Sequence, residues 1–409
     1  MQMNSSSIRA RSGARRVLSM MAVIAVSASA ASAQQCDDLV GLGTLGGSYS
    51  EALGVSGDGQ VIVGWAETAG GLRRAFRKVG NGPLQELGAF GTFSWSFAHE
   101  TSGDGGVVVG ESTNSSGNQR AFRWVPGGGM QDLGTLGGLS SWAYAISSGG
   151  TVIAGKAELG TGEIHAFRRA SSGGMQDLGT LGGTFSEAVG VSSNGSTVVG
   201  WSTNANGSER AFRWTAGGGM QPIPGLANVD SNATAVSADG SVVVGRAFIV
   251  AESRYRAFRW SASGGLTLLP YLPGFQQYAL AWGVSADGSV VVGEVRNPSN
   301  QTRAFRWTAS EGSVNLGTLG GPGAIAFGVS GDGRVIVGSS YELSGEFDAA
   351  KWTRACPADL DCSGGVDSDD VIRFFTAWDA GDLLADFTGD GGVDGDDTIA
   401  FFGRWDSGC

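Results

Sequence analysis

Two acidic segments near the C-terminus have the residue types and spacing of calcium-binding loops. They begin at Asp359 and Asp386, and each carries oxygen side chains at loop positions 1, 3, 5 and 12 and a glycine at position 6. Calcium takes about six to eight oxygen ligands in a flexible shell, and the glycine permits the sharp turn that such a loop needs. The sequence therefore predicts two calcium ions. Their predicted ligands are Asp359, Asp361, Ser363, Asp370 and the carbonyl of Gly365 in the first loop, and Asp386, Thr388, Asp390, Asp397 and the carbonyl of Gly392 in the second.

The alternative interpretation is an acidic, solvated tail without metal. Residues 357–409 hold thirteen aspartates and two arginines, so their carboxylates repel one another unless a cation binds among them. Position 9 of each loop, Asp367 or Asp394, is a further oxygen donor that acts directly or through water. Ser363 and Thr388 depart from the usual Asp or Asn ligands, which puts the affinity in question. We expect the tail to fold with calcium and to loosen without it.

A short helix is expected after each loop, over residues 371–378 and 398–405. Both stretches place apolar residues at helical spacing, and neither contains glycine or proline in its first turn. The apolar positions that predict the two helices are Ile372, Phe375, Trp378, Ile399, Phe402 and Trp405.

The tail resembles a type I dockerin, and more closely the GC-type dockerin-like module at the C-terminus of exported planctomycete proteins. The duplicated loops with Asp at position 12, Cys356-Pro357-Ala358-Asp359 at the start and Gly408-Cys409 at the end carry the resemblance. It covers residues 356–409 and implies a small α-helical domain with paired calcium loops. It also implies a protein receptor, either cohesin-like or a component of envelope sorting.

The body of the chain repeats one motif. Ala-Phe-Arg-Trp begins at residues 121, 211, 257 and 304, and variants begin at 75, 166 and 349, which gives spacings of 45–47 residues. In the repeat at 186–223 we predict four strands, over 186–192, 197–201, 210–215 and 220–222, because β-branched runs alternate with Asn-Gly and Gly-rich turns. Four short strands in a repeat of this length indicate a β-propeller blade.

The ends of the repeat array are complementary. The seventh repeat stops after its third strand, at Trp352, and residues 37–42 supply a strand of the missing kind before the first blade. We therefore predict an all-β fold, a seven-bladed β-propeller of four-stranded antiparallel blades latched by the N-terminal strand. An open β-solenoid is the alternative.

The motifs of the body resemble the bacterial extracellular HAF repeat family. Leu-Gly-Thr-Leu-Gly-Gly, Val-x-Val-Gly and Ala-Phe-Arg-Trp carry the resemblance, and Ile164-His165-Ala166-Phe167 keeps the His-Ala-Phe that names the family. It covers residues 38–353, implies export and leaves the biochemical activity undefined.

The predicted organisation is a signal peptide over 1–33, the propeller over 34–355 and the dockerin-like domain over 356–409. Four arginines precede a short apolar run, and Ala31-Ser32-Ala33 offers a cleavage site, with an uncleaved membrane anchor as the alternative. The predicted location is the periplasm, the cell surface or the medium, where disulfides form. Closure of the ring would place Cys36 next to Cys356, and the expected disulfides are then Cys36–Cys356 and Cys362–Cys409. The alternative pairing is Cys356–Cys409 with Cys36–Cys362.

Composition argues against several functions. Only two of 409 residues are histidines, His99 and His165, and neither accompanies a Ser elbow or a nearby Cys, so no catalytic dyad is predicted. The net charge of −11 argues against nucleic acid and anionic membrane as partners. After cleavage of the signal peptide no membrane span is expected.

Residues that obey the repeat symmetry are expected to be structural. The cation of the marker motif is expected to lie on an aromatic ring, with a polyanion-binding ring as the alternative. The turn aspartates are expected to stabilise hairpins rather than hold metal. The cations are Arg77, Arg123, Arg168, Arg213, Arg259, Arg306 and Lys351, and the aspartates are Asp58, Asp104, Asp239, Asp287 and Asp332.

Residues that break the symmetry indicate a binding site. Aromatic residues of this kind stack on sugars or hold peptides, although contact between blades is the alternative explanation. We expect a binding or structural propeller rather than an enzyme, with a possible polysaccharide or peptide ligand. The asymmetric aromatics are Phe90, Phe93, Trp95, Phe97, Trp142, Tyr144, Tyr255, Tyr271, Tyr278 and Trp282.

The alternative function is an exported glycosidase or lyase that acts on polysaccharide through Glu51, Glu100, Glu111 or Glu187. Two acids about 5–10 Å apart across the channel mouth would favour a glycosidase. A channel lined only by small residues and backbone would favour binding.

Overall fold

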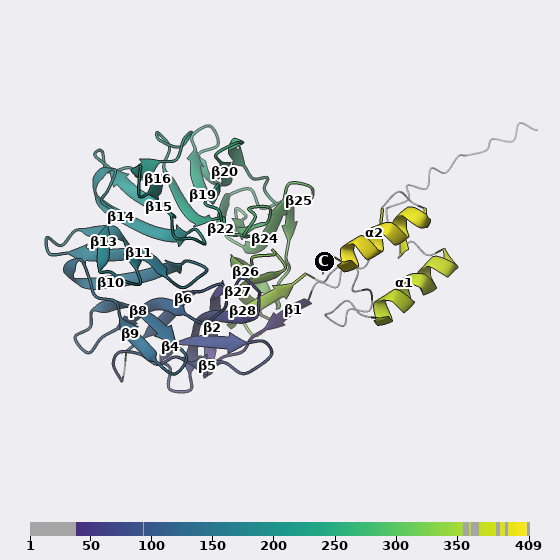
Figure 1. Cartoon of the computed structure of the whole chain (residues 1–409), viewed down its shortest axis with the longest axis horizontal. Coiled ribbons are helices and arrows are strands. Elements are labelled where there is room, and N and C mark those ends of the chain that lie inside the picture. The colour runs from purple at the N-terminus through teal and green to yellow at the C-terminus, as the bar shows by residue number, and fades with distance from the viewer. Residues whose placement is uncertain are drawn as a thin grey trace, which may run out of the picture. The chain divides into compact units, whose positions relative to one another are not determined.

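The computed structural model describes residues 38–92, 94–354, 360, 368–381, 385–388 and 392–406 (Figure 1). These residues fall into two compact units, a larger one of strands up to residue 354 and a smaller one of helices from residue 360. The predicted signal peptide, all four cysteines with their pairing, and Phe93 lie outside the described residues. No helix in the described part of the chain is long and apolar enough to cross a membrane.

The larger unit consists of antiparallel sheets whose strands follow the repeats (Figure 1). A single parallel bridge between Ile164 and Phe185 joins β10–β13 to β14–β17, and the other sheets have four strands each. The strands are β2 (Gly46–Val55), β3 (Val61–Thr68), β4 (Arg73–Val79) and β5 (Gln85–Glu86); β6 (Ser96–Thr101), β7 (Val108–Thr113), β8 (Gln119–Val125) and β9 (Gly129–Asp132); β10 (Gly137–Ile146), β11 (Val152–Leu159), β12 (Ile164–Ala170) and β13 (Met175–Asp177); β14 (Gly182–Val191), β15 (Thr197–Asn204), β16 (Glu209–Thr215) and β17 (Gly219–Pro222); β18 (Ser231–Val236), β19 (Val242–Ile249), β20 (Arg254–Ser261) and β21 (Gly265–Leu268); β22 (Tyr278–Val284), β23 (Val291–Arg296), β24 (Thr302–Thr308) and β25 (Gly312–Asn315); β26 (Gly320–Val329), β27 (Val335–Glu342) and β28 (Phe347–Thr353); and β1 (Asp38–Gly41).

The four strands predicted over 186–223 are present as β14 to β17. The turn between the first two strands of a repeat is closed by its polar side chains, as expected of the turn aspartates. In one example the Ser237 hydroxyl and the Ser241 N–H donate to Asp239 at 2.7 and 2.9 Å, and Gly240 takes a φ of 78°. These two hydrogen bonds lower the pKa of Asp239 to about 2. The same Ser–Asp hydrogen bond forms at Asp58, Asp104, Asp287 and Asp332.

The glycine of the Val-x-Val-Gly motif allows the first two strands of each repeat to approach closely. A Cβ atom at Gly200 would lie 1.9 Å from the carbonyl oxygen of Glu187, which no side chain tolerates. The same distance of 1.9 Å separates a carbonyl oxygen from a Cβ atom placed at Gly64, Gly110, Gly155 or Gly338. The recurrence of this glycine in the repeats therefore follows from a close contact between two backbones.

The core lies between neighbouring sheets. The phenylalanine and alanine of the marker motif are buried, as at Phe212 and Ala211, and the Trp214 ring beside them is nearly so. Phe212 and Trp214 pack on Ala166 of the preceding repeat. Each sheet thus buries its apolar face against the next one.

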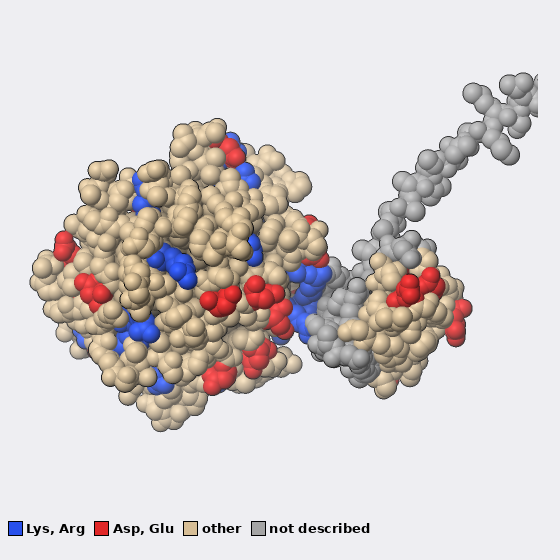
Figure 2. Space-filling model, turned by 45° about the horizontal axis from the view of Figure 1, so that its top comes forward, with Lys and Arg blue, Asp and Glu red and all other residues tan. Residues whose placement is uncertain are grey.

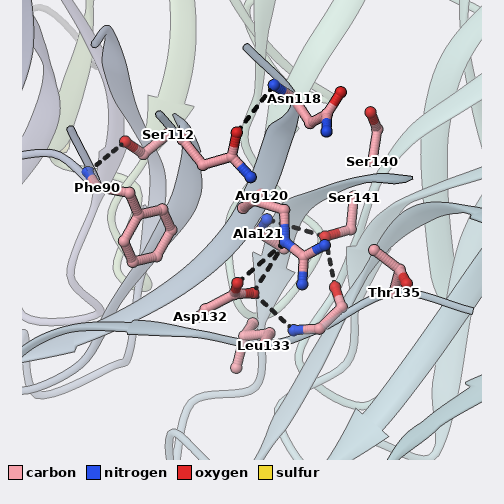
Figure 3. Close-up of polar contacts among 12 residues, drawn as sticks. Phe90, Ser112, Asn118, Arg120, Ala121, Asp132, Leu133, Thr135, Ser140 and Ser141 are labelled. Atoms are coloured by element: carbon pink, nitrogen blue, oxygen red, sulfur yellow. Dashed lines mark hydrogen bonds and ion pairs between the residues drawn. The ribbon is translucent and has the colours of Figure 1, made fainter. Parts of the chain in front are cut away.

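A serine on the first strand of a repeat links it to the preceding repeat (Figure 3). The Ser141 hydroxyl accepts from the backbone N–H of Ala121 at 3.0 Å and donates to the carbonyl of Gly134 at 2.6 Å. Figure 3 also shows the Arg120–Asp132 ion pair beside this junction. Ser96, Ser186 and Ser231 accept the equivalent N–H bond at three other junctions.

The same bond joins the last repeat to the first, and the N-terminal strand completes the last sheet. Ser50 accepts from the N–H of Ala349 at 2.8 Å. Strand β1 pairs antiparallel with β28, with Asp38 opposite Thr353 and Gly41 opposite Ala350. The predicted latch strand is therefore confirmed, and the array is closed through its two ends.

The marker cations whose contacts are described have a structural role. For most of them the predicted partner, an aromatic ring, is wrong. Arg77, Arg168, Arg213 and Arg259 donate through Nε to a turn carbonyl in the next repeat, at 3.0–3.3 Å. Arg168 also lies over the Trp214 ring at 5.9 Å, as expected, whereas Arg306 pairs with Glu311. The carbonyl belongs to a left-handed turn glycine, a partner that repeat counting alone does not reveal.

The smaller unit contains α1 (Ser368–Ala380) and α2 (Gly395–Asp406), at the two predicted places. Its core uses only part of the apolar stripe that predicted the helices, since Trp378 and Phe402 pack against it. Phe374 and Phe401 are fully buried and stack with ring centroids 4.3 Å apart. Ile372 and Ile399 are instead 64% and 72% exposed. Both kinds of position have helical spacing, so the choice of face depends on how the two helices meet.

Candidate functional site

A cavity of about 900 Å³ lies where the first strands of the repeats, here called the inner strands, meet. Each inner strand has a β-bulge at its middle, where the pairing register shifts by one residue. The bulge re-aims one side chain per repeat, and these side chains all line the cavity. They are Leu53, His99, Tyr144, Val189, Thr234, Trp282 and Phe327.

The residues around the cavity vary while the framework that holds them is constant. Alanine precedes every bulge residue, yet the position before that alanine, and its partner on the second strand, differ from repeat to repeat. The asymmetry expected of a binding site is therefore concentrated at these positions, most of which line the cavity. The paired positions are Glu51 with Trp65, Phe97 with Glu111, Trp142 with Lys156, Glu187 with Trp201, Asn232 with Arg246, Leu280 with Glu294, and Ile325 with Ser339.

On the side formed by the first repeat, a carboxylate, an indole and a guanidinium lie together. The Trp65 Nε1–H donates to Glu51 at 2.9 Å, and the Arg73 guanidinium lies over the Trp65 ring at 4.6 Å. Burial raises the pKa of Glu51, although the Trp65 hydrogen bond and the Arg73 charge oppose this. The arrangement holds the Trp65 ring, which lines the cavity, in place.

Two lining residues, Tyr144 and Glu187, contact an ammonium group. Lys156 pairs with Glu187 at 2.9 Å and lies 5.1 Å from the Trp142 ring and 5.5 Å from the Tyr144 ring. Trp201 lines the cavity beside Glu187 and stacks on Phe185, with centroids 4.6 Å apart. Lysine and aromatic side chains here hold one another in place.

The opposite wall is a chain of hydrogen bonds around Arg246. Its Nε donates to Asn232 at 2.7 Å, and its guanidinium donates to the Tyr278 hydroxyl at 3.0 Å. The Asn232 amide in turn donates to Glu209 at 3.0 Å. Arg296, which lines the same wall, pairs with Glu294 at 3.0 Å. One hydrogen-bond network therefore connects four polar side chains, those of Glu209, Asn232, Arg246 and Tyr278.

The second repeat contributes a cluster of titratable residues. His99 Nε2 bonds to the Glu111 carboxylate, and the Tyr144 ring meets the imidazole edge-on at 5.0 Å. Burial lowers the pKa of His99, but the Glu111 carboxylate more than compensates, and the net direction is upward. Burial raises the pKa of Glu100 to about 7.

The predicted carboxylates meet the cavity in part. Glu51, Glu100 and Glu187 line it, while Glu111 is bonded to His99 behind it. The wall is not built of small residues and backbone alone, the arrangement that would have favoured simple binding. His99, which sequence spacing dismissed, faces the cavity because of its bulge.

Several lining residues were not predicted from the sequence. Trp65, Trp201, Arg246, Glu294 and Arg296 are spread over repeats whose motifs are otherwise regular. Aligning the repeats against one another would have identified the first four, since these occupy variable positions between constant ones.

The asymmetric aromatics divide between the cavity and the core. Phe97, Tyr144, Tyr278 and Trp282 line the cavity, whereas Phe90 and Tyr271 pack against core clusters, as the alternative explanation expected. Trp95 is 50% exposed and lines a separate groove of the second repeat.

Part of the second predicted calcium loop is described. Both oxygens of Asp397 accept backbone N–H groups, from Thr388 at 2.7 Å and from Asp394 at 2.8 Å. Thr388 also reaches Asp386 through its hydroxyl, at 3.4 Å. Positions 1, 3 and 12 of the loop therefore lie together, and oxygen donors of this kind suit calcium.

The remaining predicted ligands are not brought together in the described chain. Asp370 is buried at the start of α1 and Gly392 precedes α2, while Asp359, Asp361, Ser363, Gly365 and Asp390 lie outside the described residues. Among the residues that are described, no three His, Cys, Asp or Glu side chains form a metal-binding group. Calcium stays a prediction.

Charge on the visible face of the larger unit is sparse. Figure 2 shows small separate groups of acidic and basic residues on a surface that is mostly neither. No continuous basic surface is visible on this face, which agrees with the structural role of the marker arginines.

No family model matches the chain, and no characterised protein matches it in sequence. Solved structures are similar in fold, among them a puromycin hydrolase (16% identity, TM-score 0.52), a puromycin-hydrolyzing peptidase from Mycobacterium tuberculosis (13%, 0.50) and TolB from Acinetobacter baumannii (13%, 0.47). These matches cover 75%, 74% and 73% of this chain, and 52%, 52% and 67% of the other.

The chain thus spans about half the length of the two hydrolases that it matches. At such low identity the similarity concerns the fold alone. Together with the closed array of four-stranded sheets, the similarity to the two hydrolases identifies the larger unit as a β-propeller.

Proposed function

We propose that the chain is an exported protein of the HAF-repeat kind, whose seven-bladed propeller binds a saccharide in its central cavity. The observation that carries the proposal is the concentration of symmetry-breaking side chains at this cavity. A repeat that serves only to build the ring has no reason to vary at these positions.

The composition of the wall favours a saccharide. Aromatic faces, here Trp65, Trp201 and Phe97, stack on the apolar faces of sugar rings, while carboxylates and amides bond to hydroxyl groups. Most of the charged side chains already have partners inside the protein, so the wall offers oriented hydrogen bonds with little free charge. A hydroxyl-rich ligand without negative charge fits such a wall better than a polyanion does.

We further propose that the tail is a dockerin-like module that holds two calcium ions and attaches the propeller to a protein receptor. The exposed Ile372 and Ile399 support this, since they occupy the same position in the two copies of the helix. An apolar side chain exposed at the same position of both helices would give a receptor two equivalent contacts.

Titration calorimetry with short neutral oligosaccharides tests the binding function. Trp201→Ala removes an aromatic face from the cavity and is expected to weaken binding about tenfold or more, because stacking and buried area are lost. Trp95→Ala, in the separate groove, is the matched control and should leave binding unchanged. Equal binding by wild type and Trp201→Ala would place the site elsewhere.

A polysaccharide-cleaving enzyme is the second candidate. It is favoured by three carboxylates, Glu51, Glu100 and Glu187, that line one cavity with His99. Release of reducing ends or of unsaturated products from polysaccharides, abolished by Glu100→Gln or Glu187→Gln, would establish it. Binding without product release would leave the saccharide-binding function.

A further inference from the structure

Glu100 occupies a position that is otherwise reserved for very small residues. Glycine or alanine follows the bulge residue in every other repeat, at Gly54, Ala145, Gly190, Ala235, Gly283 and Gly328. Only the second repeat carries a long, ionisable side chain there.

The neighbouring repeat leaves room for this carboxylate. A Cβ atom at Gly54 would lie 2.9 Å from Glu100 Oε1 and 2.7 Å from the carbonyl oxygen of His99. The absence of a side chain at Gly54 therefore opens the space in which Glu100 lies. Since Glu100 also lines the cavity, its carboxylate is accommodated at the cavity wall.

The other acids in this part of the cavity have partners. Glu187 pairs with Lys156, Glu111 with His99, and Glu51 accepts from Trp65 near the Arg73 charge. The charge that acts on Glu100 is that of its neighbour His99, which opposes the rise in the pKa of Glu100. The printed contact of Glu100 is with the N–H of its neighbour Thr101, at 2.9 Å.

No ion pair joins Glu100 to a cation among the described residues, because its neighbour His99 is already bonded to Glu111. Burial outweighs the opposing charge of His99 and favours the neutral form of Glu100, in agreement with its raised pKa. A cationic group supplied from the cavity would both restore the charge balance and satisfy the free carboxylate oxygen.

We propose that the saccharide carries a protonated amine, as in a hexosamine, and that Glu100 binds this amine. The inference rests on the saccharide-binding function proposed above and adds the chemical class of the ligand. The aromatic rings would stack on the sugar, and Glu100 would select the amino sugar over its neutral counterparts.

Binding of two matched ligands tests this proposal. Oligomers of glucosamine and of N-acetylglucosamine have the same linkage and length and differ in the charge of the amino group. At about pH 7, where both the amine and Glu100 are partly ionised, we expect the wild-type protein to bind the glucosamine oligomer about tenfold more tightly than the acetylated one. Glu100→Gln should abolish this preference and change the affinity for the acetylated oligomer by less than about twofold.

Glu100→Ala is the second variant, since alanine occurs naturally at the equivalent position of two other repeats. Glu163→Gln, on an exposed turn, is the control and should keep the wild-type preference. Equal affinity of the wild-type protein for the two oligomers would overturn the role of Glu100 while leaving saccharide binding intact. Binding of neither these oligomers nor neutral ones would refute the saccharide-binding function itself.

Discussion

Replacing Glu100 by glutamine removes a charge from the central cavity and keeps the shape of the side chain. Burial raises the pKa of Glu100 from 4.5 to about 7 in the folded protein. The folded state therefore retains this proton over a pH range in which the unfolded chain has released it. By linkage, the contribution of Glu100 to stability is fully present below about pH 4.5 and is lost as the pH rises through about 7.

The size of the loss follows from the two pKa values. The difference between 4.5 and about 7 corresponds to about 3 kcal/mol, since one pH unit equals about 1.4 kcal/mol. Glu100 is half-buried and faces an open cavity, so solvent screening reduces this upper limit. We expect the free energy of unfolding of Glu100→Gln, relative to wild type, to rise by about 1.5–3 kcal/mol between about pH 4.5 and pH 8.

Urea unfolding of the full chain at several pH values measures this difference. The tail contributes equally to both proteins, so its unfolding cancels in the comparison. Glu163→Gln, at an exposed turn, should follow wild type within about 0.5 kcal/mol throughout. A difference between Glu100→Gln and wild type that does not change with pH would refute the reasoning, because it would mean that Glu100 titrates alike in the folded and unfolded chains.

Three further changes probe the framework and the tail. Ser141→Ala leaves the buried N–H of Ala121 without its partner and should lower the free energy of unfolding by about 1–3 kcal/mol, whereas Ser171→Ala, on the surface, should not. Gly200→Ala forces a Cβ against the Glu187 carbonyl and should cost about 3 kcal/mol or more, seen as a lower urea midpoint. Chelation should reduce the helical circular dichroism of the chain, and calcium should restore it; an unchanged spectrum would contradict the calcium prediction.

The strands and the latch were predictable because they depend on local pattern. Alternating residues and turn glycines fix the strands of a repeat such as 186–223, and the incomplete last repeat identifies the strand that closes it. The strands are given by consecutive residues, and the latch follows from comparing the incomplete last repeat with the start of the chain.

The cavity was harder to predict because it depends on register. The side chain at each bulge faces the channel only because one residue is inserted into the strand pairing, as at His99 between Ala98 and Glu100. Sequence spacing placed His99 far from any catalytic partner, yet its partner Glu111 lies on the adjacent strand β7, opposite Phe97. Cross-strand neighbours follow from pairing, which spacing along the chain does not give.

The tail shows the same limit in helices. Phe374 and Phe375 are adjacent, and both match a helical apolar stripe. The stacking of Phe374 on Phe401 decides which of them is buried, and this contact joins segments 27 residues apart.

The pairing of β1 with β28 has a consequence for how the chain acquires its structure. The strand that is synthesised first finds its partner last, since Leu39 lies opposite Trp352. Until synthesis reaches β28, the edge of β1 is unpaired and the last sheet lacks its outer strand. Every shorter chain is thus an open array with two exposed ends. The pairing of β1 with β28, whose strands are far apart in the sequence, forms only when the chain is complete. This favours slow, all-or-none folding of the ring.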